Sequence, residues 1–156
     1  MFVRYLMPML LFMLICCSSP LHAAQKPAAN EALAELETAK VIFDVRLADL
    51  DSLIFNLKLM DETWKGIAAQ NVKPEMIVVF RGPTVKLLTP AELDEEALHL
   101  FRVLKKKGVR FEACGVAIRI FKVDPAGLIP EVKLVANVFH SLIGYQNKNY
   151  ALIVIN

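Results

Sequence analysis

Short apolar runs alternate with segments of helical periodicity from residue 39 to the end of the chain, and this alternation restricts the fold more than any other feature. An apolar run in which polar residues do not alternate with apolar ones is typical of a strand buried on both sides, as in a parallel sheet covered by helices. The sequence therefore predicts an α/β fold, namely a single-domain three-layer sandwich with a five-stranded, mostly parallel sheet. The predicted strands are residues 41–45, 76–80, 109–114, 132–136 and 150–155.

Apolar residues at steps of three and four predict an amphipathic helix after the first strand. Asp49 or Asp51 can cap its start, and Asn71 fits its end. Two shorter helices are predicted at residues 116–123 and 138–145, the second with Asn137 as a candidate cap. Residues 85–88 fit either a loop or a single turn of helix.

A further helix is predicted before the third strand. Thr89 and Glu92 have the spacing of a capping box, and Pro90 occupies the first helical position. Residues 105–107 are the only basic run, and three lysines in a last helical turn interact favourably with the helix dipole. Gly108 then provides a left-handed stop. The lysine run therefore needs no binding partner to explain it.

One cysteine stands at the junction between a predicted strand and a predicted helix. Residues 109–113 alternate with period two, Gly115 interrupts the pattern, and Cys114 lies between them. Open α/β sheets place ligand crevices at the carboxyl ends of their strands, and amide groups at a helix start favour a thiolate. A reactive thiol is one interpretation. A buried, inert cysteine that packs as a small hydrophobe is equally compatible with the sequence.

If Cys114 is functional, its neighbours are the residues that follow the other strands at the same sheet edge. Arg46 or Arg81 near the sulfur would favour a thiolate and could bind an anionic substrate, although either also fits a solvated surface arginine. The acids Asp44 and Glu112 are further candidates, but a single acid is more often a cap or an ion-pair partner than a catalyst. The candidate binding residues are Asp44, Arg46, Arg81, Gly82, Gly115 and Asn137.

The first 24 residues have the layout of a secretory signal peptide. Arg4 supplies a positive start, residues 6–17 are apolar, and a small, polar stretch permits cleavage after Ala23 or Ala24. The apolar run is shorter than the roughly 20 residues of a membrane-spanning helix. We therefore expect a signal peptide at 1–24, a leader or linker at 25–38, a domain at 39–156, a periplasmic location, and no stable membrane anchor after cleavage.

Cleavage also changes the cysteine and charge balance. Cys16 and Cys17 leave with the signal, so Cys114 cannot form an internal disulfide. Loss of Arg4 lowers the formal net charge from +2 by one, to +1. A nearly neutral exported domain has no electrostatic footprint for nucleic acid.

Motifs for nucleotide binding and for a serine nucleophile are absent. The sequence contains no G-x-G-x-x-G, no G-x-x-x-x-G-K-[ST] and no G-x-S-x-G. His99 and His140 remain after signal removal, but neither has metal-ligand spacing to Cys114. His99 is expected on the solvent side of its helix. We expect neither a metal site nor a cofactor.

Several segments between Lys40 and Ile155 together resemble the DsrE-like sulfur relay family. The matching pieces are AKVIFDV, NLKLM, IVVFRGPTVKLL, GVRFEACGVAIR and PEVKLVANVFHSLIGYQNKNYALI. The resemblance implies a flavodoxin-like (DsrE-like) topology and a homo-oligomer, commonly a trimer or a hexamer. It also implies that Cys114, in FEACGVA, occupies the position of the persulfide-carrying residue. Related proteins often carry a histidine where this chain has Arg81.

Two main hypotheses about function follow from these observations. The first is a small exported member of that family, a periplasmic sulfur-handling protein in which Cys114 accepts or carries sulfane sulfur as a persulfide. The sequence does not identify the sulfur donor or the acceptor thiol. If the protein is catalytically active, its activity would be that of a sulfurtransferase. The second is a non-catalytic oligomeric binding or assembly module in which Cys114 is structural. An oxidant sensor would often carry a resolving cysteine, which the mature chain lacks.

Overall fold

A computed structural model describes residues 31–156 and shows five parallel strands in one sheet. The strands run in the order β4-β3-β2-β1-β5, so the last strand returns across the sheet to pair with the first. The single-domain α/β sandwich predicted from the sequence is confirmed, and every strand pair is parallel. The strands are β1 (Thr38–Val45), β2 (Lys73–Phe80), β3 (Arg110–Cys114), β4 (Val132–Val135) and β5 (Ala151–Ile155).

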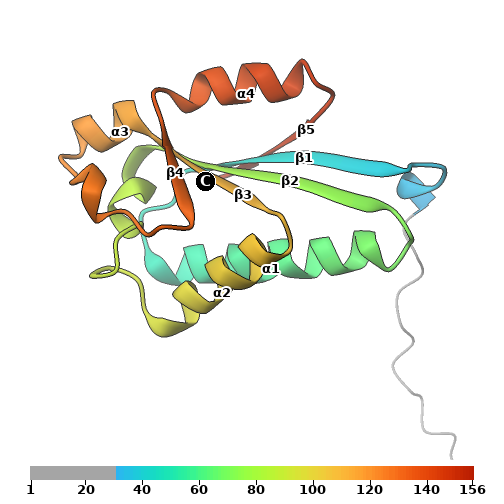
Figure 1. The fold of residues 1–156 in the computed structure, drawn as a ribbon, viewed down its shortest axis with the longest axis horizontal. Helices are drawn as coiled ribbons and strands as arrows, with labels where there is room; N and C mark the ends of the chain where they lie inside the picture. Colours follow the sequence, from blue (N-terminus) through green and yellow to red (C-terminus); the bar gives the residue numbers. More distant parts are fainter. Residues whose placement is uncertain (1–30) are drawn as a thin grey trace, which may run out of the picture.

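Helices cover both faces of the sheet (Figure 1). α1 (Leu50–Ala68) and α2 (Glu95–Lys106) lie against one face, and α4 (Val138–Gln146) lies over the other. The short α3 (Gly115–Ile120) follows β3 directly on the α4 side. Three 3-10 turns complete the described chain, at Glu31–Leu33, Gly82–Leu87 and Pro125–Gly127. The second of these, η2, follows β2, so residues 85–88 are mostly helical turn.

The core between the sheet and the α1–α2 layer is the larger of the two. Phe80, Phe101 and Phe111 meet at its centre, with ring centroids 5.0–6.0 Å apart. All three are at most 1 % exposed. Aromatic side chains of this size bury the most apolar area per residue, so this cluster contributes a large part of the folding free energy.

Local signals fix most of the helix ends. Asp49 caps α1, because its carboxylate accepts a hydrogen bond from the Ser52 amide at 2.8 Å. Asn71 and Gly108 both take positive φ after helices, as their positions in the sequence suggest. None of the helices within residues 31–156 is both long and apolar enough to cross a membrane. The predicted signal peptide at 1–24 and the start of the 25–38 segment lie outside the described residues.

The capping box predicted at Thr89 is wrong. α2 begins at Glu95, and Asp94 caps it by accepting from the Ala97 amide at 2.8 Å. The Thr89 carbonyl instead accepts from the Leu93 amide at 3.1 Å in a turn before the helix. Leu93 is buried in the larger core, so this segment turns inward before the helix starts. Burial of that leucine has overridden the local capping pattern.

Candidate functional site

Cys114 is the last residue of β3 and directly precedes α3. It is free of disulfides and only 5 % exposed, and it forms part of the smaller apolar core between the sheet and the α4 layer. Its Sγ lies 4.0 Å from the side-chain oxygen of Asn137, the residue that caps α4. The thiol therefore has one polar neighbour at the sheet edge and apolar packing beneath it.

Arg81 and Asp44 form a two-pronged ion pair at the same edge. The Arg81 Nε donates to Asp44 Oδ1 at 2.7 Å, and Nη2 donates to Oδ2 at 2.9 Å. Asp44 is 5 % exposed, so its carboxylate is largely removed from water, and the ion pair with Arg81 offsets the cost of this desolvation. Hydrogen bonding to Asp44 raises the pKa of Arg81 above its ordinary value, and the negative charge of a Cys114 thiolate adds to the effect. Arg81 follows β2 and Cys114 ends β3, and the pairing of Phe80 with Ala113 makes the two residues neighbours at the sheet edge.

The turn that carries Arg81 is fixed by a buried hydroxyl. Thr84 is fully buried, and its Oγ1 accepts from the Leu47 amide and donates to the Leu47 carbonyl at 2.8 Å. This clamp joins η2 to the segment that follows β1. Gly82 within the turn has φ +59°, and a Cβ there would lie 3.1 Å from Arg46 Cγ. The register of Arg81 and Asp44 comes from the pairing of β1 with β2 and from the Arg81 amide, which donates to the Val45 carbonyl at 3.1 Å.

Gly115 is required by close backbone contact rather than by its own dihedral angles. A Cβ at this position would lie 2.9 Å from the Val135 carbonyl oxygen and 3.1 Å from that of Ala136. Only a residue without a side chain lets the end of β4 approach the β3–α3 junction this closely. That approach brings Asn137, the next residue after Ala136, to the side of Cys114.

α4 faces β3 through polar residues spaced four apart. Asn137 is beside Cys114, and Ser141 one turn later donates to the buried carboxylate of Glu112. Tyr145, a further turn along, donates to the other Glu112 oxygen at 3.2 Å. Partial burial raises the pKa of Tyr145, and the Glu112 charge adds to that shift. Residues 112 and 114 share one face of β3, and α4 runs in the opposite direction along that face. This ladder of contacts, from Ser141 and Tyr145 to Glu112, therefore sets the position of Asn137 relative to the sulfur.

The structure brings together Cys114, Asn137, Arg81 and Asp44, four of the residues predicted from strand ends. Gly82 and Gly115 contribute no side chain to the site, but each allows a close approach that a Cβ would hinder, of Arg46 at Gly82 and of the end of β4 at Gly115. Arg46 is exposed and lies against Gly82, and no contact between it and Cys114 is seen.

Three features of the site were not predicted from the sequence. Phe139 is 54 % exposed, and its ring centre lies 6.0 Å from the Arg81 guanidinium carbon. The Thr84 clamp and the Ser141–Tyr145 contacts with Glu112 were missed as well. The four-residue spacing of Asn137, Ser141 and Tyr145 was a signal that could have revealed the ladder.

Neither His99 nor His140 belongs to this cluster. His99 is exposed on α2, as expected, and His140 is exposed on α4, where it lines a cavity of 290 Å³ with Ser141, Gly144, Tyr145 and Lys148. Within residues 31–156, no group of three or more histidine, cysteine and acidic side chains is arranged to hold a metal ion.

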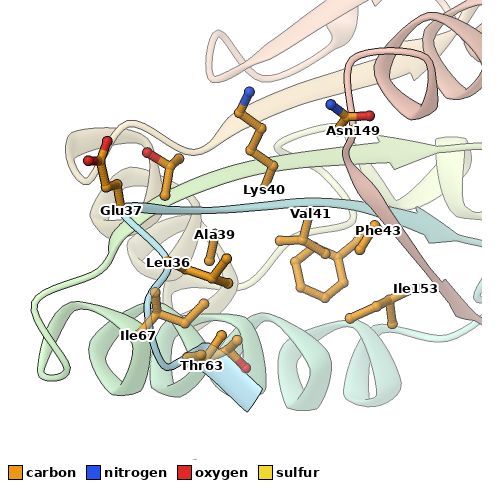
Figure 2. Close-up of a pocket in the computed structure, with 13 residues that line it drawn as sticks. Leu36, Glu37, Ala39, Lys40, Val41, Phe43, Thr63, Ile67, Asn149 and Ile153 are labelled. Carbon is orange, nitrogen blue, oxygen red and sulfur yellow. The ribbon is translucent and has the colours of Figure 1, made fainter. Parts of the chain in front are cut away.

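A cavity of 660 Å³, shown in Figure 2, is not lined by Cys114. Its lining residues include Ala39, Val41 and Phe43 of β1, Thr63 and Ile67 of α1, and Ile153 of β5. These lie toward the beginning of β1, whereas Cys114 is at the carboxyl end of β3. The candidate site at the carboxyl edge of the sheet is therefore separate from this cavity.

Comparison with known proteins gives a family and a fold. The model of the DsrE/DsrF-like family matches residues 14–155. The structure of MTH1491 from Methanobacterium thermoautotrophicum, described as a protein of unknown function, aligns with a TM-score of 0.62 at 22% identity, covering 74% of this chain and 98% of that one. The ychN protein from E. coli aligns with a TM-score of 0.53 at 12% identity, covering 76% and 98%. No curated protein matches the chain.

Proposed function

This chain belongs to the DsrE/DsrF-like family, and from that premise we propose that it handles sulfur in the periplasm, with Cys114 carrying sulfane sulfur as a persulfide. Membership of the family suggests a sulfur relay-type role in general terms. The observation that supports the specific role is the grouping of a free cysteine with Arg81 and Asn137 at the carboxyl edge of a parallel sheet.

The proposed reaction is redox-neutral and uses no cofactor. The Cys114 thiolate attacks the terminal sulfur of a donor such as thiosulfate or a polysulfide, and a new S–S bond forms. The bond between that sulfur and the rest of the donor breaks, and sulfite or a shortened polysulfide leaves with the electron pair. An acceptor thiolate then attacks the outer sulfur, and Cys114 leaves as a thiolate.

Arg81 and Asn137 have separate roles in this proposal. The Arg81 charge stabilises the thiolate and attracts an anionic donor, while Asp44 holds the guanidinium through Nε and Nη2 and leaves Nη1 outside that pair. Asn137 keeps α4 anchored beside the sulfur through its cap to the Phe139 amide at 3.0 Å. Because Cys114 is 5 % exposed, the site favours small donors over bulky ones.

The test is the intact mass of the purified protein after incubation with thiosulfate or polysulfide. We expect a gain of one or more sulfur atoms that a reductant removes. Cys114→Ser abolishes the gain, and Arg81→Gln reduces it by about tenfold, the equivalent of losing one charge-assisted contact. Failure of the wild-type protein to take up sulfur from either donor would exclude the carrier role for these donors.

A second candidate function, a non-catalytic binding or assembly module, is favoured by the burial of Cys114 in the smaller apolar core. Thiol labelling separates the two candidates. In a carrier, Cys114 reacts with a small alkylating reagent in the native protein. In a structural role, it reacts only after unfolding.

The periplasmic location is tested separately from the chemistry. The mass of the protein isolated from cell fractions should correspond to a chain that begins after Ala23 or Ala24 and should be found in the periplasmic fraction. Recovery of the full-length chain from the cytoplasm would contradict export.

A further inference from the structure

β1 extends beyond one of the two strands beside it. It pairs with β2 along its whole length, from Thr38 to Val45, but β5 pairs with it only from Val41 onward. At residues 38–40, β1 therefore has an edge that no strand in the described part of the chain covers. A free strand edge is a template for pairing with another chain.

The main-chain groups at this edge are unpaired. The Arg46 amide, just after β1, donates to the Ile155 carbonyl of β5 at 2.8 Å. Because successive residues of a strand direct their main-chain groups to opposite sides, the even-numbered residues of β1 face the β5 side. The Lys40 amide and both main-chain groups of Thr38 thus point to the uncovered side, where they form no hydrogen bond with any described residue. These groups are free to bind the main chain of a ligand.

The 660 Å³ cavity opens beside this edge (Figure 2). Thr38 and Lys40 both line it, together with apolar side chains that include Val41, Phe43 and Ile153. Figure 2 shows the three apolar side chains on one side of β1 and the Lys40 side chain pointing to the other. The volume is within the range of about 300–1,000 Å³ that is usual for ligand-binding cavities.

Lys40 adds a positive charge to this edge. Its Nζ lies 5.8 Å from the centre of the Tyr150 ring, and it forms no ion pair with an acidic residue of the described chain. Its register partner on β2, Glu75, instead forms hydrogen bonds with Lys73 and Tyr150. A strand added beside residues 38–40 would therefore alternate its side chains between the apolar cavity and the Lys40 ammonium group.

We infer that the edge of β1 at residues 38–40 binds a short extended peptide of another protein, in which large apolar residues alternate with acidic ones. The unpaired main-chain groups hold the peptide backbone, the cavity takes the apolar side chains, and Lys40 faces the acidic ones. The residues before the described chain, 25–30, have the sequence QKPAAN, whose largest apolar side chain is proline, so they do not match the cavity. The inference does not depend on the reactivity of Cys114.

The test is the binding of a fluorescein-labelled, end-blocked hexapeptide of alternating leucine and glutamate to the purified full chain, measured by fluorescence anisotropy. We expect saturable binding that is about tenfold tighter than that of the same peptide with alanine in place of leucine, because alanine leaves the cavity unfilled. Lys40→Gln should weaken binding about threefold. The matched control Glu37→Gln removes the opposite charge from a residue that lines the same cavity, and it should not weaken binding.

A second pair of variants tests the cavity itself. Thr63→Trp places a large ring at the cavity and should abolish binding, whereas Glu62→Trp, at an exposed neighbour that does not line it, should leave binding unchanged. Thr38→Pro removes a main-chain donor at the first position of β1, where a proline is tolerated, and should weaken binding without lowering the melting temperature. Thermal melting of every variant separates loss of binding from loss of folding.

N-methylation of the probe separates strand addition from non-specific apolar binding and uses only the wild-type protein. Methyl groups on the leucine nitrogens and on the glutamate nitrogens block opposite edges of an extended peptide. One of the two methylated peptides should lose binding and the other should keep it, because only one edge faces β1. Absence of saturable binding by the leucine–glutamate peptide overturns the inference, and so do equal effects of the two methylations.

Discussion

The two faces of the sheet differ in what fills them. The face under α1 and α2 is packed by large apolar side chains around Phe80, Phe101 and Phe111. The face under α4 has a smaller core and contains Cys114, the buried Glu112 carboxylate and the polar side of α4. Because the first face buries most of the large apolar side chains, we expect it to supply most of the stability, and the second face to tolerate buried polar groups and a thiol.

The largest expected effect comes from the first face. Phe101→Ala should lower the free energy of unfolding by about 3–5 kcal/mol, because a fully buried ring is lost and a cavity remains. Urea denaturation measures the change. In protein that remains folded, the labelling rate of Cys114 should be unchanged, since the sheet separates the two cores. A loss of less than about 1 kcal/mol would mean that the faces share stability more evenly.

A matched pair of glycine substitutions comes next. Gly115→Ala should destabilise the protein by about 1–3 kcal/mol, because the new Cβ overlaps the Val135 and Ala136 carbonyls. Gly66→Ala in α1 meets nothing within 4 Å, and should stabilise by up to about 1 kcal/mol through helix propensity. Thermal unfolding of both variants measures the contrast. Equal effects would show that the close approach at Gly115 is not needed.

The polar ladder on the second face is tested through Glu112. Glu112→Ala removes the acceptor of Ser141 and Tyr145, so α4 should open more often and Cys114 should be alkylated about tenfold faster. Glu112→Gln keeps one acceptor oxygen and should have a smaller effect. Native-state labelling kinetics followed by mass spectrometry give both rates. An unchanged rate in Glu112→Ala would show that the ladder does not control access to the thiol.

The smallest effect is a pH dependence on the first face. Burial acts to raise the pKa of Asp61, but hydrogen bonds from Lys107 and Lys65 outweigh it and hold the pKa below the ordinary value of 3.8. A carboxylate with a lowered folded-state pKa stabilises the protein above its unfolded-state pKa, and this contribution is lost as pH falls through the folded-state pKa. Denaturation of wild type and Asp61→Asn at neutral pH and below pH 3.8 should therefore show a difference that shrinks in acid.

Much of the fold could be predicted from sequence because its signals are local. The strands were found from apolar runs, and the α1 cap at Asp49 and the turn at Gly108 follow from residue types with a fixed conformational preference. The helix start predicted at Thr89 was wrong because the chain offers two local capping signals, the Thr89–Glu92 spacing and Asp94. Packing decides between them, since Leu93 is buried in the core and the helix starts after Asp94.

The sequence by itself determined the α/β alternation and placed Cys114 at the carboxyl edge of the sheet. It also predicted that Asp44, Arg81 and Asn137 share that edge. Only the tertiary structure decided that Asp44 pairs with Arg81, 37 residues away, rather than with Arg46 two residues on. It also set the pairing of Glu112 with α4 and, among residues 31–156, left Leu152, Ile153 and Val154 of β5 between 41 % and 49 % exposed. The physical reason is that periodicity reports which face of an element is buried, whereas a partner is chosen by strand order and by the free energy of desolvating each charge.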